Sequence, residues 1–246
     1  MIKLLTHFGK YLMMLGGMFT KPENARVYYK EFVHQCYELG IGSLGIVVII
    51  SLFLGAVTTV QTAYQLVSPL VPKHVIAQVI RDSTLLELSP TVVCIVLAGV
   101  IGSKIASELG NMRVSEQIDA LEIMGINTKT YLILPKIVAS FLVIPCLITI
   151  SMFLSIWGGY LAGTLSGILT EQQYTQGLVT EFNAYNLGFG LLKSFTFAFI
   201  ISSISAYFGY NVKGGALEIG QSSTTSVVVS CILILFADYG LAALLL

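Results

Sequence analysis

Five long apolar blocks constrain the fold of this chain more than any other feature of its sequence. They lie at about residues 43–66, 88–109, 131–161, 187–210 and 225–246. Each reaches the roughly 20 residues that a helix needs to cross the apolar core of a bilayer. Only 11% of the residues are charged, which is too few to cover a soluble surface, since soluble domains have about 25%. We therefore predict an all-α integral membrane protein with five transmembrane helices.

Lysine and arginine side chains set the expected orientation, because they are enriched on the cytoplasmic side of membrane proteins. With the N-terminus in the cytoplasm, the 13 lysines and arginines lie on or near the inside, except for Lys73, Arg81 and Lys193. We therefore expect a cytoplasmic N-terminus, a C-terminus on the periplasmic side, and a cytoplasmic loop over residues 110–130.

The first 40 residues differ from the apolar blocks. Lys3, His7 and Lys10 recur at helical spacing, while leucine and phenylalanine side chains from Leu4 to Leu15 cover the other face. This pattern predicts an amphipathic helix that lies in the membrane interface, with a solvent-facing tail as the alternative. Residues 23–39 predict a second, more polar helix that leads into the first span. The start lacks the apolar region and cleavage site of a signal peptide.

The loop between the second and third blocks is the most informative segment. Val114, Ile118 and Leu121 repeat at i, i+4 and i+7, and Gly125 is a typical helix stop. The pattern predicts a short amphipathic helix over residues 112–125. Such a helix either docks into the groove of a partner protein or packs on the membrane helices as an ordinary loop helix. The pattern alone favours the ordinary loop helix.

The identity of the residues in this region changes that balance. Acidic and amide side chains are closely spaced in the run Ser107-Glu-Leu-Gly-Asn-Met-Arg-Val-Ser-Glu-Gln-Ile-Asp-Ala-Leu-Glu-Ile-Met-Gly-Ile126. This run resembles the signature of the MlaE family, the permease subunits of lipid-trafficking ABC transporters. The resemblance extends to Glu87-Leu-Ser-Pro90, Lys193-Ser194 and Gly215-Ala-Leu-Glu-Ile-Gly-Gln-Ser-Ser-Thr-Thr225. It covers nearly the whole chain, as a single permease domain over residues 1–246.

The resemblance implies a function for the whole chain. It would be the permease subunit of an ABC transporter that moves phospholipid between the inner membrane and a periplasmic MCE-protein carrier. The implied partners are a second copy of the chain, a cytoplasmic ATPase subunit and a periplasmic MCE-domain oligomer. ATP and Mg²⁺ would bind to the ATPase, since this sequence has no GxxxxGK[ST] motif. We expect a bacterial inner membrane, because no Arg- and Ser-rich transit peptide is present.

The resemblance also places the contact with the ATPase on the short loop helix, which would act as a coupling helix. The residues expected there are Glu116, Gln117, Asp119, Ala120, Leu121, Met124 and Gly125. No residue is expected to bind a metal or to act in catalysis.

Charged side chains inside membrane helices are costly and are by default functional candidates. Glu87, Lys193 and Asp238 are therefore candidates for the substrate path, and Lys104 lies near the inner end of its span. For Glu87 and Lys193 we favour the simpler reading, in which the charged groups snorkel to the interface. A hydrogen bond between helices explains Asp238 equally well.

Polar and small residues in two spans have two readings each. Thr58, Gln61, Tyr64 and Gln65 either face a lipid head group or make hydrogen bonds between helices. Glycines repeat every four residues at positions 159, 163 and 167, which predicts a close helix contact within or between subunits. The four cysteines form no CxxC pair, so we expect small buried side chains.

Two other functions remain as alternatives. A stand-alone secondary transporter or channel for an apolar or amphiphilic solute predicts inverted repeats, and no convincing repeat is present. An intramembrane enzyme predicts a motif such as HExxH or GxSxG, which the sequence lacks. Neutral net charge gives no sign of nucleic-acid binding.

Overall fold

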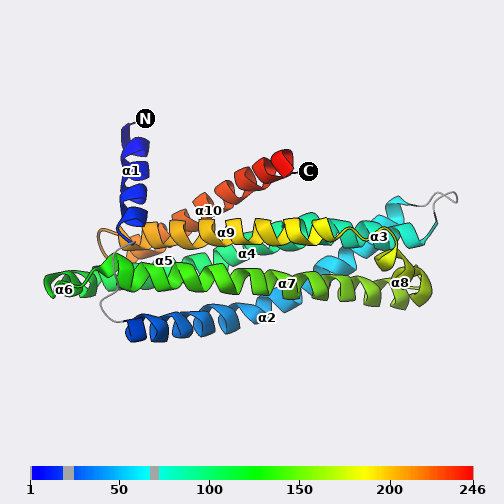
Figure 1. The fold of residues 1–246 in the computed structure, drawn as a ribbon, viewed down its shortest axis with the longest axis horizontal. Helices are drawn as coiled ribbons and strands as arrows, with labels where there is room; N and C mark the ends of the chain where they lie inside the picture. Colours follow the sequence, from blue (N-terminus) through cyan, green and yellow to red (C-terminus); the bar gives the residue numbers. More distant parts are fainter. Residues whose placement is uncertain (1, 19–24, 67–71, 246) are drawn as a thin grey trace. The chain divides into compact units, whose positions relative to one another are not determined.

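The computed structural model describes residues 2–18, 25–66 and 72–245, and its regular elements are all helical (Figure 1). α1 (Ile2–Gly16) precedes the long α2 (Ala25–Gln65). A continuous helical run then contains α3 (His74–Ser83), η1 (Thr84–Val92), α4 (Val93–Leu97), η2 (Ala98–Gly102) and α5 (Ser103–Val114). The remaining elements are α6 (Gln117–Ile123), η3 (Lys129–Ile133), α7 (Leu134–Leu165), α8 (Glu171–Val179), α9 (Ala184–Tyr210) and α10 (Ala216–Leu245).

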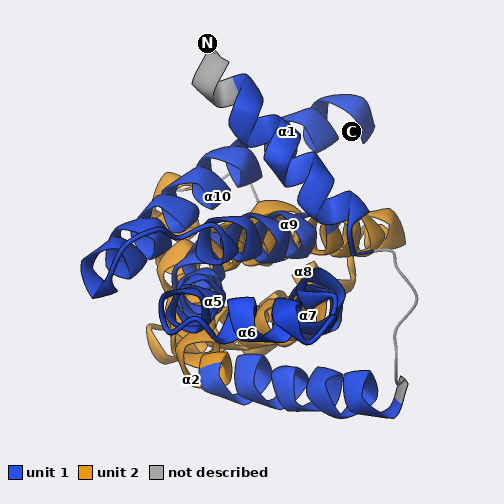
Figure 2. Cartoon of the chain, turned by 90° about the vertical axis from the view of Figure 1, so that its left-hand side faces the viewer, with its two compact units in different colours: residues 1–42, 95–143, 196–246 blue, residues 43–94, 144–195 orange. Residues whose placement is uncertain are grey.

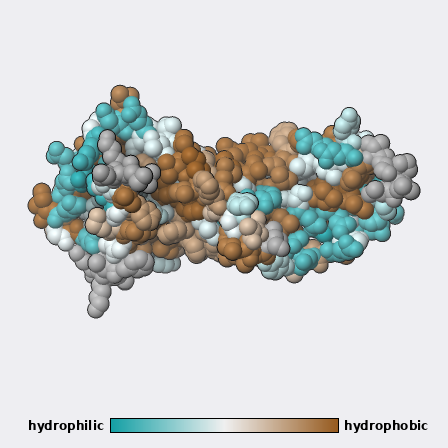
Figure 3. All heavy atoms as spheres, turned by 90° about the horizontal axis from the view of Figure 1, so that it is seen from above, coloured by the Kyte–Doolittle hydropathy of each residue, from teal (hydrophilic) through white to brown (hydrophobic). Residues whose placement is uncertain are grey.

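The prediction of an all-α membrane protein with five spans is confirmed. Five helical segments in the described residues are long and apolar enough to cross a membrane: 26–65, 74–114, 129–165, 184–210 and 216–245. Several begin earlier than predicted, because polar residues continue the helix beyond its apolar block. Figure 3 shows one face of the molecule, where apolar side chains form a broad area of the kind that lipid covers.

Three segments, η1, η2 and η3, have the wider turns of a π-helix. Pro90 lies inside η1 and has no N–H to donate to the preceding turn. Turns of this kind are rare and are often found at functional sites. η1 also contains Glu87, one of the charged residues singled out in the sequence.

The chain divides into two compact units, drawn in different colours in Figure 2. Unit 1 contains Met1–Gly42, Ile95–Val143 and Thr196–Leu246, and unit 2 contains Ser43–Cys94 and Ile144–Phe195. The connections between successive spans alternate between the units. Those around residues 115–128 and 211–215 belong to unit 1, and those at 66–73 and 166–183 belong to unit 2.

In unit 1, α1 is attached to α9 by polar contacts. The His7 Nδ1 and Tyr207 Oη atoms are 2.8 Å apart, and Tyr11 donates a hydrogen bond of 2.9 Å to Ser203 Oγ. Burial raises the pKa of the Tyr11 phenol, although the bond to Ser203 opposes the shift. His7 therefore faces α9, contrary to the predicted polar face. The side chains of Lys3 and Leu4 lie outside the described residues.

The predicted apolar face of α1 is exposed within this chain. Leu5, Phe8 and Leu12 are 64%, 57% and 50% exposed. Such a face suits a helix in the membrane interface, which stays a prediction.

In unit 2, α2 and α7 approach until their backbones touch. A Cβ added at Gly55 would lie 1.8 Å from the Ser155 carbonyl oxygen, and one at Gly158 would lie 2.3 Å from the Leu52 carbonyl oxygen. Ser51 Oγ donates to Ser151 Oγ at 2.8 Å beside this contact. The glycines here are therefore required by the close approach of two helices.

Of the three glycines in the predicted repeat, only Gly159 and Gly163 take part in this contact. A Cβ at Gly159 would meet Thr59 and Tyr174, and one at Gly163 would meet Thr59. Gly167 lies beyond the end of α7, has a φ of +69° and faces open space. It ends the helix, as glycine commonly does, and does not belong to the seam.

α3 and α8 pack together in unit 2 around a small apolar cluster, made of Ile76, Ala77, Ile80, Leu169 and Tyr174. Burial raises the pKa of the Tyr174 phenol, whose hydroxyl donates to the Ile156 carbonyl at 2.7 Å. Arg81 is almost fully buried and donates to the carbonyls of Leu178 and Thr180 at 2.9 and 2.8 Å. This arginine therefore satisfies carbonyl groups at the end of α8, which have no partner inside the helix.

Candidate functional site

The loop between the second and third spans folds as two short helical pieces. α5 continues to Val114, and Ser115 Oγ donates to the Asn111 carbonyl at 2.7 Å as the helix ends. Glu116 then has a φ of +58°, in the left-handed region, which turns the chain into α6. The helix that we predicted over residues 112–125 is therefore divided, and only Gln117–Ile123 form α6.

Gly125 ends α6 in the manner that the sequence indicates. Its φ is +82°, and its N–H donates to the Glu122 carbonyl at 3.0 Å. The N–H of Ile126 reaches back to the Leu121 carbonyl at 3.1 Å. These bonds satisfy the last carbonyl groups of the helix.

Two acidic residues of α6 hold the loop to the rest of unit 1. Asp119 forms an ion pair of 2.6 Å with Arg113 of α5. The Glu122 carboxylate accepts hydrogen bonds from Thr128 at 3.1 Å and from Tyr210 of α9 at 2.8 Å. Ile118 is fully buried beneath the helix. α6 is thus held in place by one buried apolar side chain and by three polar contacts of its two acidic residues.

The outer side of α6 is exposed and carries unusual apolar groups. Ile123 and Met124 are 88% and 66% exposed. Glu116, Gln117, Ala120 and Gly125 are also exposed, whereas Asp119 and Leu121 are half-buried. The sequence analysis singled out Met124 but missed Ile123. The one signal in the sequence that Ile123 faces outward is its position outside the apolar stripe at i, i+4 and i+7.

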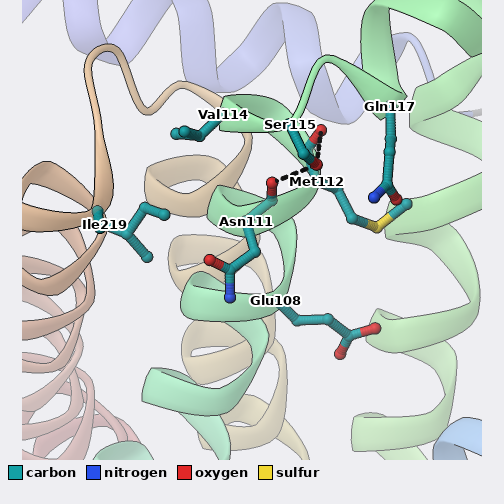
Figure 4. A pocket seen from close by; sticks show the side chains of 8 residues that line it. Glu108, Asn111, Met112, Val114, Ser115, Gln117 and Ile219 are labelled. Atoms are coloured by element: carbon teal, nitrogen blue, oxygen red, sulfur yellow. Dashed lines mark hydrogen bonds between the residues drawn. The ribbon is translucent and has the colours of Figure 1, made fainter.

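A groove of about 400 Å³ lies beside this loop in unit 1 (Figure 4). Val114 and Ser115 at the end of α5 line it, together with Gln117 of α6 and Ile219 of α10. Figure 4 shows the Ile219 side chain extending from α10 toward α5. The groove places the first turns of α10 next to the α5–α6 turn.

Glu87 and Lys193 form an ion pair in unit 2. Lys193 Nζ lies 2.7 Å from Glu87 Oε1 and donates to the Leu86 carbonyl at 3.1 Å. It also lies 4.9 Å from the centre of the Phe189 ring. Thr91 donates to the other Glu87 oxygen at 3.2 Å. The Lys193 side chain is 0% exposed and that of Glu87 is 46% exposed.

This geometry corrects the snorkelling that we favoured for Lys193. The ammonium group does not extend toward an interface, since it is enclosed by a carboxylate, a carbonyl and an aromatic face. An ammonium ion without such partners is costly to bury. The Glu87 side chain, by contrast, keeps nearly half of its surface accessible, so it is the exposed member of the pair.

The other candidates for the substrate path are spread over different helices. Thr58 is half-buried and donates to the Leu54 carbonyl of its own helix at 2.8 Å. Gln61, Tyr64 and Gln65 lie near the end of α2 in unit 2, and all three are exposed. Asp238 is half-buried in α10 and belongs to unit 1. Among the described residues, no group of three or more His, Cys, Asp or Glu side chains could hold a metal ion.

The fold and the loop define a class: a multi-pass α-helical membrane protein with a firmly attached amphipathic loop helix. Comparison with known proteins identifies the family. The model of the family described as Permease MlaE matches residues 32–244. The chain therefore belongs to the MlaE permease family and is a transmembrane permease subunit, which confirms the resemblance seen in the sequence.

Similar proteins occur in bacteria and in plastids. A probable ABC transporter permease protein of Rickettsia bellii is 34% identical over 97% of this chain and 92% of its own length. A probable ABC transporter permease protein of Synechocystis is 29% identical over 94% of this chain and 88% of its own length. Protein TRIGALACTOSYLDIACYLGLYCEROL 1 of Arabidopsis thaliana, a chloroplastic protein, is 31% identical over 94% of this chain and 66% of its own length.

Proposed function

We propose that this chain is the membrane subunit of an ABC transporter that moves phospholipid, driven by a separate ATPase bound at α6. One observation supports this proposal above the others: Ile123 and Met124 are exposed on a helix whose inner side is fixed by Ile118, Asp119 and Glu122. Exposed apolar side chains on a rigid helix are the usual anchors of a helix-in-groove interface. The rigid attachment lets movement of the ATPase act on α5 and α9.

A lipid substrate suits the apolar character of the spans. Extracting a two-chain lipid with about 30 methylene groups costs on the order of 24 kcal/mol, at about 0.8 kcal/mol per group. An apolar path through the protein lowers this cost, and an external source of energy supplies what remains. Within that path, the Glu87–Lys193 pair offers a partly accessible carboxylate that could meet a polar head group.

The proposed assembly has a second copy of the chain and a periplasmic MCE-domain oligomer. In the most apolar stretch of each span, 56% of the residues are buried in the second, third and fourth spans, but 22% in the first and 11% in the last. The first and last spans therefore have the largest apolar surface left for lipid or for a second copy.

The proposed orientation has the N-terminus in the cytoplasm of a bacterial cell and the C-terminus in the periplasm. The distribution of lysine and arginine supports it, because ten of the 13 lie in the segments that this orientation assigns to the inside. The segments rich in lysine and arginine, which the charge rule assigns to the inside, all belong to unit 1.

Replacing the two exposed apolar residues at the end of α6, Ile123 and the following Met124, by aspartate should release the ATPase. An anchor residue contributes at least about 2 kcal/mol to an interface, so we expect Ile123→Asp/Met124→Asp to weaken the complex by more than about tenfold. The measurement is the amount of the cognate ABC ATPase that co-purifies with the solubilised permease. Glu116→Lys should act in the same direction, because Glu116 is exposed at the start of α6 and the change reverses its charge.

Leu165→Asp is the matched control, since Leu165 is 85% exposed but lies in unit 2 at the end of α7. It should leave the ATPase bound. At Asp119 the test uses a variant with the two charges exchanged, Arg113→Asp/Asp119→Arg. This variant reverses the charge at position 119 but keeps the ion pair with position 113. Retention of the ATPase by the Ile123→Asp/Met124→Asp variant would contradict the docking site. Lipid transfer by the permease alone in liposomes would favour the stand-alone transporter.

A further inference from the structure

A polar cavity of about 320 Å³ lies in unit 1 between the first part of α2 and α5. His34, Gln35 and Glu38 of α2 line it, together with Lys104, Glu108 and Asn111 of α5. Both helices belong to segments apolar enough to cross a membrane. Neither the proposed contact with the ATPase nor the Glu87–Lys193 pair involves this cavity.

Two ion pairs organise the charges around the cavity. Lys104 pairs with Glu38 and also donates to the Glu38 carbonyl at 3.2 Å. Lys136 of α7, which is 3% exposed, lies 2.7 Å from Glu108. The side chains of Glu38, Lys104 and Glu108 nevertheless keep 40% or 41% of their surface exposed. In a membrane helix, charges exposed to this extent are costly unless further polar groups solvate them.

The lining provides both signs of charge, with the negative sign in excess. Two carboxylates, from Glu38 and Glu108, face the cavity along with one ammonium group, from Lys104, while Lys136 lies behind Glu108. An anion alone would meet two carboxylates, and a cation alone would meet Lys104. A zwitterion with a positive end and a phosphate matches both parts of the lining.

The chemical type of the positively charged group in the ligand follows from the residue types that the lining lacks. Proteins recognise quaternary ammonium groups such as choline with cages of Trp, Tyr or Phe, and none of these lines the described cavity. Carboxylates instead accept charge-assisted hydrogen bonds from N–H groups. A primary ammonium group can donate three of these bonds and a choline group none.

We propose that this cavity binds a phosphoethanolamine group, presented as the headgroup of a membrane phospholipid. Its ammonium lies by the carboxylates of Glu38 and Glu108, and its phosphate lies by Lys104 and the Asn111 amide. Depth favours the lipid as the source. Glu38 precedes the first apolar block, which begins at about residue 43, by five residues, or about 7.5 Å along a helix at 1.5 Å per residue, which suits the headgroup layer beside the hydrocarbon core.

The site would hold α2 and α5 to one lipid in the leaflet on the side of unit 1's loops. In the orientation proposed above, this is the cytoplasmic leaflet. The binding itself needs neither ATPase nor transport, so a negative result here leaves the proposed transport function untouched.

The test measures lipid bound to the purified permease by native mass spectrometry, with thermal stability as a second readout. The probes are dioleoyl phosphatidylethanolamine, phosphatidylglycerol and phosphatidylcholine, which share their acyl chains, and soluble phosphoethanolamine. We expect phosphatidylethanolamine to be retained at least tenfold more tightly than the other two lipids. It should also raise the melting temperature, because a ligand that binds only the folded state stabilises it.

Two variants locate the effect. Glu38→Gln/Lys104→Gln removes both members of one ion pair. Ser107 of α5 also lines the cavity, and Ser107→Phe fills the cavity without replacing a member of either ion pair. Both should abolish the preference for phosphatidylethanolamine. Arg113→Gln/Asp119→Asn removes an ion pair of α5 and α6 outside the cavity and should keep the preference.

Three results would overturn the proposal. Equal retention of phosphatidylglycerol or phosphatidylcholine would show that the headgroup is not recognised. An equal rise in melting temperature with soluble phosphoethanolamine would show that the ligand is not a lipid. A preference that survives in Ser107→Phe would place the lipid elsewhere on the protein and would also contradict the site.

Discussion

Gly55→Ala should prevent the protein from folding stably, because the added Cβ would lie 1.8 Å from the Ser155 carbonyl oxygen. Overpacked cores usually lose about 1–3 kcal/mol, as side chains and backbone shift to make room. Here the obstacle is the backbone of α7, so that no side chain can rotate away and two long helices must separate. We therefore expect a loss at or above the upper end of that range. Gly158→Ala should behave in the same way against Leu52.

Gly45→Ala is the matched control, because Gly45 is in the same helix and a Cβ added there would have no neighbouring atom within 4 Å. Alanine is favoured over glycine in a helix by up to about 1 kcal/mol, so this variant should melt at or above the wild-type temperature. Fluorescence-detected size exclusion and thermal unfolding in detergent compare the two variants with the wild type. A Gly55→Ala protein that eluted and melted like the wild type would disprove the close contact.

Glu87→Gln should destabilise the protein more than Lys193→Met does. The first change leaves a fully enclosed ammonium group without its carboxylate, and stranding a buried charge in this way costs about 3–5 kcal/mol. The second change leaves a carboxylate that is 46% exposed and still accepts a hydrogen bond from Thr91. The glutamate can therefore be solvated, whereas the lysine cannot.

A double-mutant cycle tests this asymmetry. Glu87→Gln/Lys193→Met should recover much of the stability that Glu87→Gln loses, since no stranded charge remains. Arg113→Gln provides a comparison at a pair whose side chains are 33% and 48% exposed, where an effect of about 0–1 kcal/mol is usual. Equal losses from the two single variants, or a double variant as unstable as Glu87→Gln, would count against the enclosed ammonium.

The number of membrane spans could be predicted, whereas the points at which their helices begin could not. Block length and low charge are enough to predict five spans, because the requirement for apolar residues is strict in a bilayer. The helix predicted over residues 23–39 is present from Ala25 on, with His34 and Glu38 inside it, but α2 continues without a break into the first span and so begins 18 residues before the apolar block. Glu38 is held there by Lys104, 66 residues away. Pattern analysis within a window does not see a partner at that distance.

The candidate site shows the same limit. Gly125 was predicted as a helix end from local chemistry alone, and the structure agrees. The enclosure of Lys193 was missed, because it depends on Glu87 in another helix, 106 residues earlier. Gly55 and Gly158 were also missed, since each needs the other helix to explain it. The prediction that α6 contacts an ATPase depends on family resemblance as well as on exposure.

At Glu116, which has a left-handed backbone conformation, the stability of the fold and the binding of the ATPase favour different residues. A residue with a side chain loses roughly 1–2 kcal/mol in this conformation, and glycine loses almost nothing. Glu116→Gly should therefore yield a protein that melts higher but binds the ATPase less well, because it lacks the carboxylate at the start of α6. Folding and coupling thus favour different residues at position 116.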